Sequence, residues 1–301
     1  MHNINKALTL VPGPALSSAA WHAAFTAAFA DYLIGPFQLA LAQWPGFLAR
    51  QGVDMALSRA AVIDGELRAF ALVTPRPARG RWRLSTMGAL PSARGSGAAP
   101  ALLDDFVVRA GADGAAGVEL EVFAANERAL RLYRSRGFEP VHPLHGYERA
   151  PGAGRAAAAA PPVTSPLAPP ITPVTLGEAW HWLDEADAGL DDLPLQVTAP
   201  VLRLAAAFAP PGAPVQAWRH GRAQLVFAEQ PSHRTILVNS LVDRDPAQPG
   251  AQALAEALAA RYPEHTLRVA PLQRPDLGGE ALQRAGWRPQ PLHQWLMRRA
   301  V

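Results

Sequence analysis

A short run of small residues, RGSGAA at positions 94–99, constrains the fold more than any other part of the 301-residue sequence. It lies between a strand-like run, Arg83 to Leu90, and a helix-like run, Pro100 to Ala110. Small residues let a ligand approach the backbone, and a helix N-terminus that follows such a turn favours an anion. The run therefore predicts a phosphate-binding loop, with a simple tight turn as the alternative.

Two common phosphate-binding motifs do not fit this loop. The dinucleotide fingerprint GxGxxG fails because Pro100 follows Gly95 and Gly97 where a third glycine or alanine is needed. A Walker loop fails because no Gly-Lys-Ser or Gly-Lys-Thr follows. The glycines alone therefore leave the ligand undefined.

A different spacing does fit. Arg-x-x-Gly-x-Ala occurs at Arg94, Gly97 and Ala99, and the stretch LEVFAANERALRLYRSRGF follows at residues 120–138. Together the two motifs resemble the GNAT N-acetyltransferases over roughly residues 60 to 150. The resemblance implies an acyltransferase of the α/β class, with a central, mostly antiparallel sheet flanked by helices and with acetyl-CoA as co-substrate.

The resemblance also implies the site residues. The predicted cofactor-binding residues are Ala89, Leu90, Arg94, Gly95, Ser96, Gly97, Ala98, Ala99 and Asn126. Tyr133 is the expected general acid towards the departing sulfur, and Glu121 the expected base, with Glu119 on the same strand face as a competitor. The alternatives stay open: Tyr133 as a core residue, Asn126 as a helix cap, and Glu121 as a solvated carboxylate.

Apolar periodicity and turn signals predict the elements before the loop. Expected are helices at 17–33 and 37–51, strands at 58–63, 68–74 and 82–90, and a hairpin turn at Asp64-Gly65. With the second motif, the expected order is αα-βββ-α-β-α-ββ. The resemblance implies that the segment 28–47 shapes the acceptor pocket. Asp31 and Tyr32 would meet a cationic amine there and Phe37 and Trp44 would form its wall, with core packing as the alternative for the aromatic residues.

One break divides the sequence. Residues 151–173, rich in alanine and proline with almost no charge, predict a semi-rigid linker between a catalytic domain at 1–150 and a second domain at 174–301. Residues 87–106 align without gaps on 239–258, which predicts a repeated unit.

The second copy lacks the motif residues. Arg94 aligns with Pro246 and Gly97 with Pro249, and Leu282 stands in place of Tyr133. The second domain is therefore expected to be a degenerate GNAT-like domain without an acetyl-CoA site. It would complete the acceptor cleft or replace a partner subunit.

Composition excludes several classes of protein. The absence of cysteine excludes disulfides, a thiolate nucleophile and Cys-ligated zinc. A net charge of +3 is too small for a nucleic-acid face, and the basic run at 76–83 predicts a solvated hairpin loop, with a contact to CoA phosphates as the alternative. His142 and His145 have no third ligand nearby, so no metal is expected.

The distribution of apolar residues bears on localisation. No apolar run is long enough to span a membrane and no signal peptide is apparent, so a cytoplasmic monomer or homodimer is expected. The expected acceptor is the amine of a small molecule or peptide. The alternative function is a non-catalytic acyl-CoA sensor or interaction module.

Overall fold

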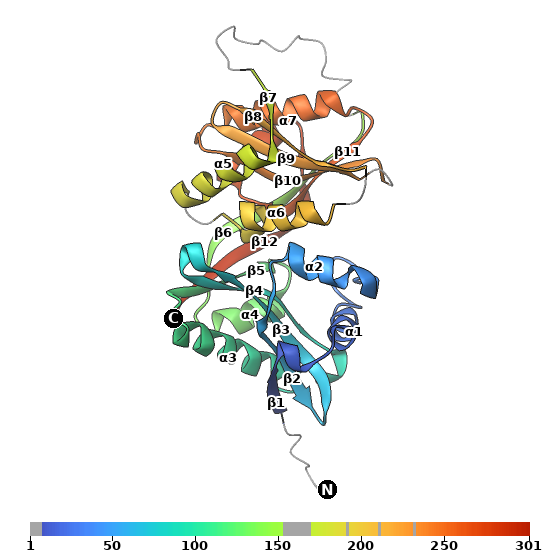
Figure 1. Cartoon of the computed structure of the whole chain (residues 1–301), viewed down its shortest axis with the longest axis vertical. Coiled ribbons are helices and arrows are strands. Elements are labelled where there is room, and N and C mark those ends of the chain that lie inside the picture. Colours follow the sequence, from blue (N-terminus) through green and yellow to red (C-terminus); the bar gives the residue numbers. More distant parts are fainter. Residues whose placement is uncertain (1–7, 153–169, 191–192, 210–211, 231–232) are drawn as a thin grey trace. The chain divides into compact units, whose positions relative to one another are not determined.

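The structure is a computed structural model that describes residues 8–152, 170–190, 193–209, 212–230 and 233–301 (Figure 1). The chain divides into two compact units. The first comprises Met1–Val122, Asn126–Val141 and Leu296–Val301, and the second comprises Phe123–Ala125 and His142–Trp295. Residues 153–169 of the predicted linker lie outside the described part, so the predicted domain boundary stays a prediction.

The N-terminal half begins with a strand and two helices, which are followed by three consecutive strands and then by alternating helices and strands. They are β1 Leu8–Pro12, α1 Ser18–Ala28, α2 Trp44–Arg50, β2 Asp54–Ile63, β3 Glu66–Arg76, β4 Arg81–Ala89, α3 Ala98–Ala112, β5 Gly117–Phe123, α4 Glu127–Arg134 and β6 Glu139–Arg149. In the first unit β1 to β4 pair antiparallel in sequence order, and β5 pairs parallel with β4. The predicted mixed α/β class is confirmed.

The elements of the C-terminal half repeat this order. They are β7 Thr172–Val174, α5 Leu176–Gly189, α6 Ala199–Ala207, β8 Val215–His220, β9 Ala223–Gln230, β10 Thr235–Asp243, α7 Pro249–Arg261, β11 Thr266–Gln273, α8 Gly279–Arg284 and β12 Arg288–Ala300. Strands β7 to β10 pair antiparallel in order, β10 and β11 pair parallel, and β11 pairs antiparallel with β6. Both halves therefore read β-α-α-β-β-β-α-β-α-β.

The hairpin prediction was correct and the helix boundaries were not. Asp64 and Gly65 have φ of 54° and 80° and join β2 to β3. Helix α1 ends at Ala28, five residues before its predicted end, and α2 begins at Trp44 instead of residue 37. Pro45 explains the second difference, because proline is tolerated in the first turn of a helix but not in its interior.

The expected order of elements lacked β1 and wrongly placed two consecutive strands after the last helix of the first domain. Strand β6 is followed by a turn, in which the Gly152 N–H donates to Pro263 O at 2.9 Å. The strand segment expected after it is supplied instead by residues 296–301, which belong to the first unit. There Leu296 and Met297 are fully buried, and Val301 N–H donates to Ala116 O at 3.4 Å.

The aromatic residues around Phe25 in the first unit pack together in a core. The Phe25 ring lies within 4.6–5.5 Å of the rings of Phe29, Phe37, Trp44, Phe47 and Phe70. Figure 1 shows α1 and α2 on one side of this sheet and α3 on the other. Core packing, one of the two interpretations of Phe37 and Trp44, is thus the correct one.

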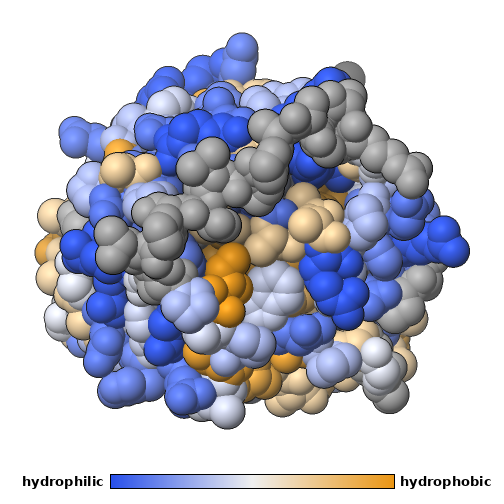
Figure 2. Space-filling model, turned by 90° about the horizontal axis from the view of Figure 1, so that it is seen from above, coloured by the Kyte–Doolittle hydropathy of each residue, from blue (hydrophilic) through white to orange (hydrophobic). Residues whose placement is uncertain are grey.

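Strand alternation separates two cores in the second unit. Leu225 and Phe227 of β9 pack with the residues of α7, whereas Val226 packs with α5 and α6. Large apolar side chains are mostly inside, and the face shown in Figure 2 is covered mainly by hydrophilic residues with small hydrophobic areas between them.

We expect Gly117→Ala to destabilise the first unit. A Cβ at this position would lie 2.9 Å from the backbone oxygen of Arg299, which cannot move without breaking the adjacent strand. Crowding of this kind costs about 1–3 kcal/mol, measurable as a lower midpoint of urea unfolding. Gly189→Ala is the control, because a Cβ there meets nothing within 4 Å; equal midpoints for the two variants would contradict the close approach.

Candidate active site

The backbone of the predicted phosphate loop has a conformation that requires glycine. Between β4 and α3, Gly95 and Gly97 have φ of 85° and 87°, a region that residues with a side chain rarely adopt. A Cβ at either position would meet nothing within 4 Å. The glycines are therefore needed for the turn itself, and the space beside them is open to a ligand.

The loop presents N–H groups at the start of a fifteen-residue helix. Gly97 is the N-cap of α3, and the Ala98 N–H donates to Ser96 Oγ at 3.3 Å. In the part of the chain that the structure describes, no hydrogen bond uses the N–H of Gly95, Gly97 or Ala99. Together with the helix dipole, these groups form a cradle for an anion such as a diphosphate.

The loop arginine is already paired with a carboxylate. Arg94 donates through both terminal nitrogens to Asp31, each at 2.6 Å, and both side chains are partly exposed. This hydrogen bond lowers the pKa of Asp31 and raises the pKa of Arg94. Asp31 was expected in the acceptor pocket, and the structure places it at the phosphate loop.

Beside the loop, β4 leaves its parallel neighbour. The pairing of β4 with β5 covers only Arg81–Leu84 against Gly117–Leu120. Further along, the Leu90 N–H donates to Arg68 O at 2.8 Å, towards β3. Since successive N–H groups of a strand alternate, the Ala89 N–H points to the opposite edge, from which β5 has diverged. Ala89 is thus available as a donor there, whereas the Leu90 N–H is not.

Helix α4 carries two predicted site residues, Asn126 and Tyr133, and it contacts Tyr32 of the segment 28–47. Asn126 is the N-cap of α4 and accepts from the Ala129 N–H at 3.2 Å, so the capping interpretation is correct. The Tyr32 hydroxyl is hydrogen-bonded to the Asn126 side chain. Tyr32 therefore lies at the amino end of the helix that carries Tyr133.

Tyr133 is buried with 7% of its surface exposed, and its ring lies 5.9 Å from that of Phe138. Burial, and to a smaller extent the neighbouring Tyr32, raise the pKa of Tyr133 well above its ordinary value of 10.0. The phenol therefore keeps its proton at neutral pH. The stability that it contributes is present below about pH 10 and is lost as the pH rises through the higher folded-state pKa.

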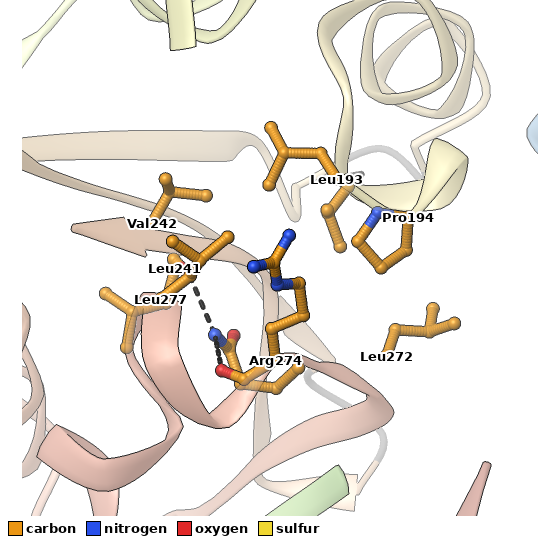
Figure 3. A pocket seen from close by; sticks show the side chains of 9 residues that line it. Leu193, Pro194, Leu241, Val242, Leu272, Arg274 and Leu277 are labelled. Carbon is orange, nitrogen blue, oxygen red and sulfur yellow. Dashed lines mark hydrogen bonds between the residues drawn. The ribbon is translucent and has the colours of Figure 1, made fainter. Parts of the chain in front are cut away.

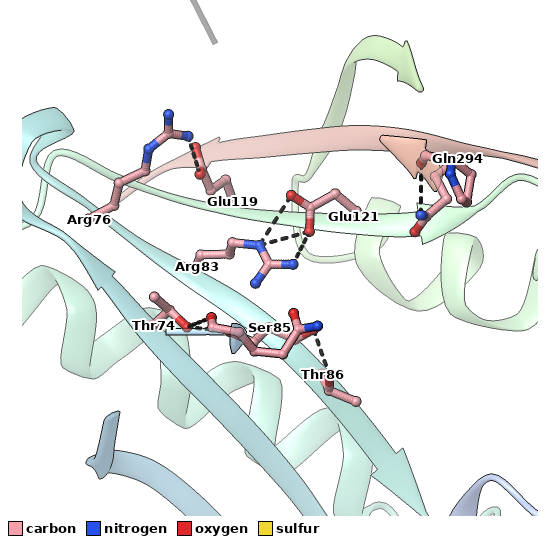
Figure 4. A network of polar contacts seen from close by, with 10 residues as sticks. Thr74, Arg76, Arg83, Ser85, Thr86, Glu119, Glu121 and Gln294 are labelled. Carbon is pink, nitrogen blue, oxygen red and sulfur yellow. Dashed lines mark hydrogen bonds and ion pairs between the residues drawn. The ribbon is translucent and has the colours of Figure 1, made fainter. Parts of the chain in front are cut away.

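The two carboxylates of β5 are buried in ion pairs and are not solvated. Glu121, with 3% of its side chain exposed, accepts from Arg83 Nε at 2.8 Å and from its terminal nitrogen at 2.5 Å (Figure 4). Glu119 is fully buried and pairs with Arg76 at 2.7 Å and Arg81 at 3.4 Å. The two glutamates share a face, as predicted, but each faces an arginine.

These arginines were misread as part of a solvated hairpin loop. Arg76 and Arg83 expose only 3% and 2% of their surfaces. The sequence holds a pattern that could have identified them: Arg81 and Arg83 alternate on β4 as Glu119 and Glu121 alternate on β5. Opposite charges at the same period on paired strands indicate buried pairs across the sheet.

The corresponding loop of the second half is filled by its own side chains. Asp243 is 1% exposed and accepts from the N–H of Ala251, at the start of α7, at 2.8 Å. Ala251 is the residue that aligns with Ala99. The carboxylate of Asp243 thus takes the position that an anionic ligand would need.

Next to it, a small pocket lies between the ends of β10 and β11. Leu193, Pro194, Val197, Leu241, Val242, Leu272, Gln273, Arg274 and Leu277 line it (Figure 3). Gln273 Nε2 donates to Leu241 O at 3.1 Å, and Leu241 is the residue that aligns with Ala89. A side chain therefore occupies the strand edge that is free on β4.

Among the described residues, no three His, Cys, Asp or Glu side chains group as a metal site. None of the helices in the described ranges is long and apolar enough to cross a membrane.

Comparisons with known proteins agree with this geometry. Residues 19–138 match the model of the acetyltransferase (GNAT) family. No curated protein matches the sequence.

Solved structures similar over the whole chain include three acetyltransferases. A putative acetyltransferase from Pyrococcus horikoshii has a TM-score of 0.62 and 12% identity, covering 100% of this chain and 91% of its own. GCN5-related N-acetyltransferases from Anabaena variabilis and Sphaerobacter thermophilus have TM-scores of 0.60 and 0.59 and identities of 13% and 16%. They cover 97% and 100% of this chain and 72% and 97% of their own. At these identities the likeness shows the fold alone.

We expect Asp31→Asn to tighten the binding of coenzyme A, because the phosphate groups would no longer compete with a carboxylate for Arg94. Because the pair is exposed and screened by solvent, the effect is small, and the Kd should fall by at most about fivefold at low salt. Calorimetric titration measures the change. Glu264→Gln, an exposed residue with the same loss of charge, is the control; unchanged or weaker binding by Asp31→Asn would show that Arg94 does not face the cofactor.

Proposed function

We propose, on the premise that residues 19–138 belong to the GNAT acetyltransferase family, that this acyltransferase domain transfers the acetyl group of acetyl-CoA to a primary amine of a small molecule or peptide. The observation that carries the proposal is the 94–99 loop, with N–H groups that no protein acceptor uses in the described structure. It opens beside the helix of the buried Tyr133.

The donor set suits a CoA thioester along its length. The diphosphate would be held by the N–H groups of Gly95, Gly97 and Ala99, with Arg94, Ser96 and Ala98 in the same turn. The pantetheine amides would follow the free edge of β4 at Ala89, while the backbone of the next residue, Leu90, is bonded to Arg68 and Ala93. Asn126 would add a polar contact besides capping α4. Acetyl-CoA supplies the activated acyl group, and the chain's part is to hold it and exclude other orientations.

In the proposed reaction, the amine nitrogen attacks the thioester carbonyl carbon and the carbon–sulfur bond breaks. The phenol of Tyr133 donates its proton to the departing sulfur, and the Ala89 N–H stabilises the negative charge on the carbonyl oxygen. The surplus proton of the amine leaves towards Glu121. No acyl-enzyme is formed, in keeping with a sequence that has no cysteine.

The ion pair of Glu121 shapes its part in this scheme. If the carboxylate itself kept the proton, the buried guanidinium of Arg83 would lose its counter-charge, at a cost of several kcal/mol. We therefore propose that Glu121 directs the amine proton to water and does not retain it. The Glu121 carboxylate, bonded to Arg83, would orient the water molecule that takes the proton as the nitrogen–hydrogen bond breaks.

We further propose that the second half is a degenerate GNAT-like copy with no cofactor site. The repeated order of elements supports a common fold, and the Asp243 carboxylate at the start of α7 supports the loss of anion binding. Pro246 and Pro249 also remove two N–H donors that Arg94 and Gly97 retain. The chain would then bind one coenzyme A.

Tyr133→Phe should lower kcat by about 10²-fold or more while leaving coenzyme A affinity unchanged, because only the proton donor is lost. The assay is thiol release from acetyl-CoA with a panel of amines. With wild-type protein, kcat should not decline through loss of this acid up to about pH 10, since burial raises the pKa of Tyr133. Full activity of the variant would eliminate Tyr133 as the acid; coenzyme A binding without turnover on any amine would support the acyl-CoA sensor instead.

Gly97→Glu should abolish coenzyme A binding, because the side chain fills the turn and adds a like charge. Gly114→Glu is the matched control: it lies after the other end of α3, has a similar φ of 80°, and its Cβ would also meet nothing within 4 Å. Wild type and the control should each bind one equivalent by calorimetry. Two equivalents per chain would refute the loss of the second site.

A further inference from the structure

The segment Leu296–Val301 lies beside the helix of the proposed acid, although it follows the whole second half in the sequence. It belongs to the first unit, and its backbone runs against Gly117 at the start of β5. Within it, Arg299 donates through a terminal nitrogen to the backbone oxygen of Arg136 at 2.6 Å. The half-buried guanidinium of Arg299 is thus bonded to a backbone carbonyl just beyond the end of α4.

That carbonyl belongs to a turn built on Tyr133. The N–H groups of Arg136 and Phe138 both donate to the Tyr133 carbonyl, at 3.0 Å and 3.1 Å. Phe138 also packs its ring against the Tyr133 ring. A shift of the Arg136 peptide therefore moves the groups that hold the backbone and the ring of Tyr133.

Helix α4 cannot fix its own position. It has eight residues, and helices this short are marginal without external contacts. Asn126 secures the amino end, and the Arg136 side chain reaches Asp104 of α3 at 3.1 Å in an exposed pair of little strength. The bond from Arg299 is the short, half-buried contact at the carboxyl end.

We propose that Arg299 is a positioning residue for Tyr133, so that the end of the second half in sequence sets the geometry of the acid in the first unit. The inference rests on the proposed function, in which Tyr133 protonates the departing sulfur. Its physical basis is the sensitivity of proton transfer to position: a misplacement of about 1 Å by a remote change costs on the order of 10²-fold in rate.

The test compares Arg299→Met with Arg299→Lys. Met keeps the apolar length of the side chain and removes the donor, so kcat should fall by roughly 10- to 100-fold with less than about a twofold change in KM for acetyl-CoA. Lys retains a donor and should restore part of kcat. Arg131→Met is the control and should keep full kcat, because Arg131 lies on the exposed face of α4 and pairs with the exposed Glu127.

A double-mutant cycle separates this inference from the proposed function. If Arg299 acts through Tyr133, Arg299→Met should have no further effect on kcat in the Tyr133→Phe background. An equal loss in both backgrounds, or unchanged kcat in Arg299→Met, would overturn the positioning role. Full activity of Tyr133→Phe alone would instead overturn the assignment of the acid. Unfolding midpoints of each variant verify that all are folded at the assay temperature.

Discussion

The divergence of β4 from β5 is the constraint on which the rest of the first unit depends. If β4 and β5 stayed paired along their whole length, no strand edge would be open to a ligand. If they separated without other contacts between them, backbone donors and apolar side chains would be exposed. Arg83 and Glu121 join the two strands where their ladder ends, and Glu119 joins them one pleat earlier. Removing one partner of such a buried pair is costly. These ion pairs, together with packing, therefore fix the point at which β4 and β5 separate, which we call the fork.

This fork also places the remaining parts of the site. The phosphate loop continues directly from β4 into α3, and α4 continues from β5, so each branch carries one part of the proposed machinery. The open edge between them carries the Ala89 N–H. Both branches start from one short ladder, and the neighbouring residues Asp31 and Tyr32 connect them, the first to Arg94 and the second to Asn126.

The sequence was informative wherever local chemistry decides the structure. Glycines marked the turns at residues 94–99 and at Asp64-Gly65, where the backbone has positive φ that few other residues adopt. Asn126 was recognisable as a cap, and Glu119 and Glu121 as residues of one face. The helix boundaries were wrong for a local reason, the position of Pro45, whereas the larger errors involve partners distant in sequence. The arginines of the buried pairs lie 38 or 43 residues from their glutamates, and residues 296–301 lie far from the strand they neighbour.

The proposed degenerate copy in the second half would keep the fold while losing the ligand site. Asp243 satisfies the N–H of Ala251, and Gln273 satisfies the strand carbonyl of Leu241. Both are internal substitutes for groups of a bound molecule, and a helix N-terminus with its own carboxylate gains stability without a cofactor. Loss of binding there is therefore compatible with a well-packed unit.

The division of β12 between the two units has a consequence for biosynthesis. The residues of the first unit up to Val141 leave the ribosome about 155 residues before Leu296 is made. At about 5–20 residues per second, this delay is of the order of 10 to 30 seconds. During that interval one edge of β5 has no neighbour from residues 296–301, so the first unit is completed only after the second has been synthesised. Until then the unpaired edge of β5 is a site at which another chain could pair with the nascent first unit.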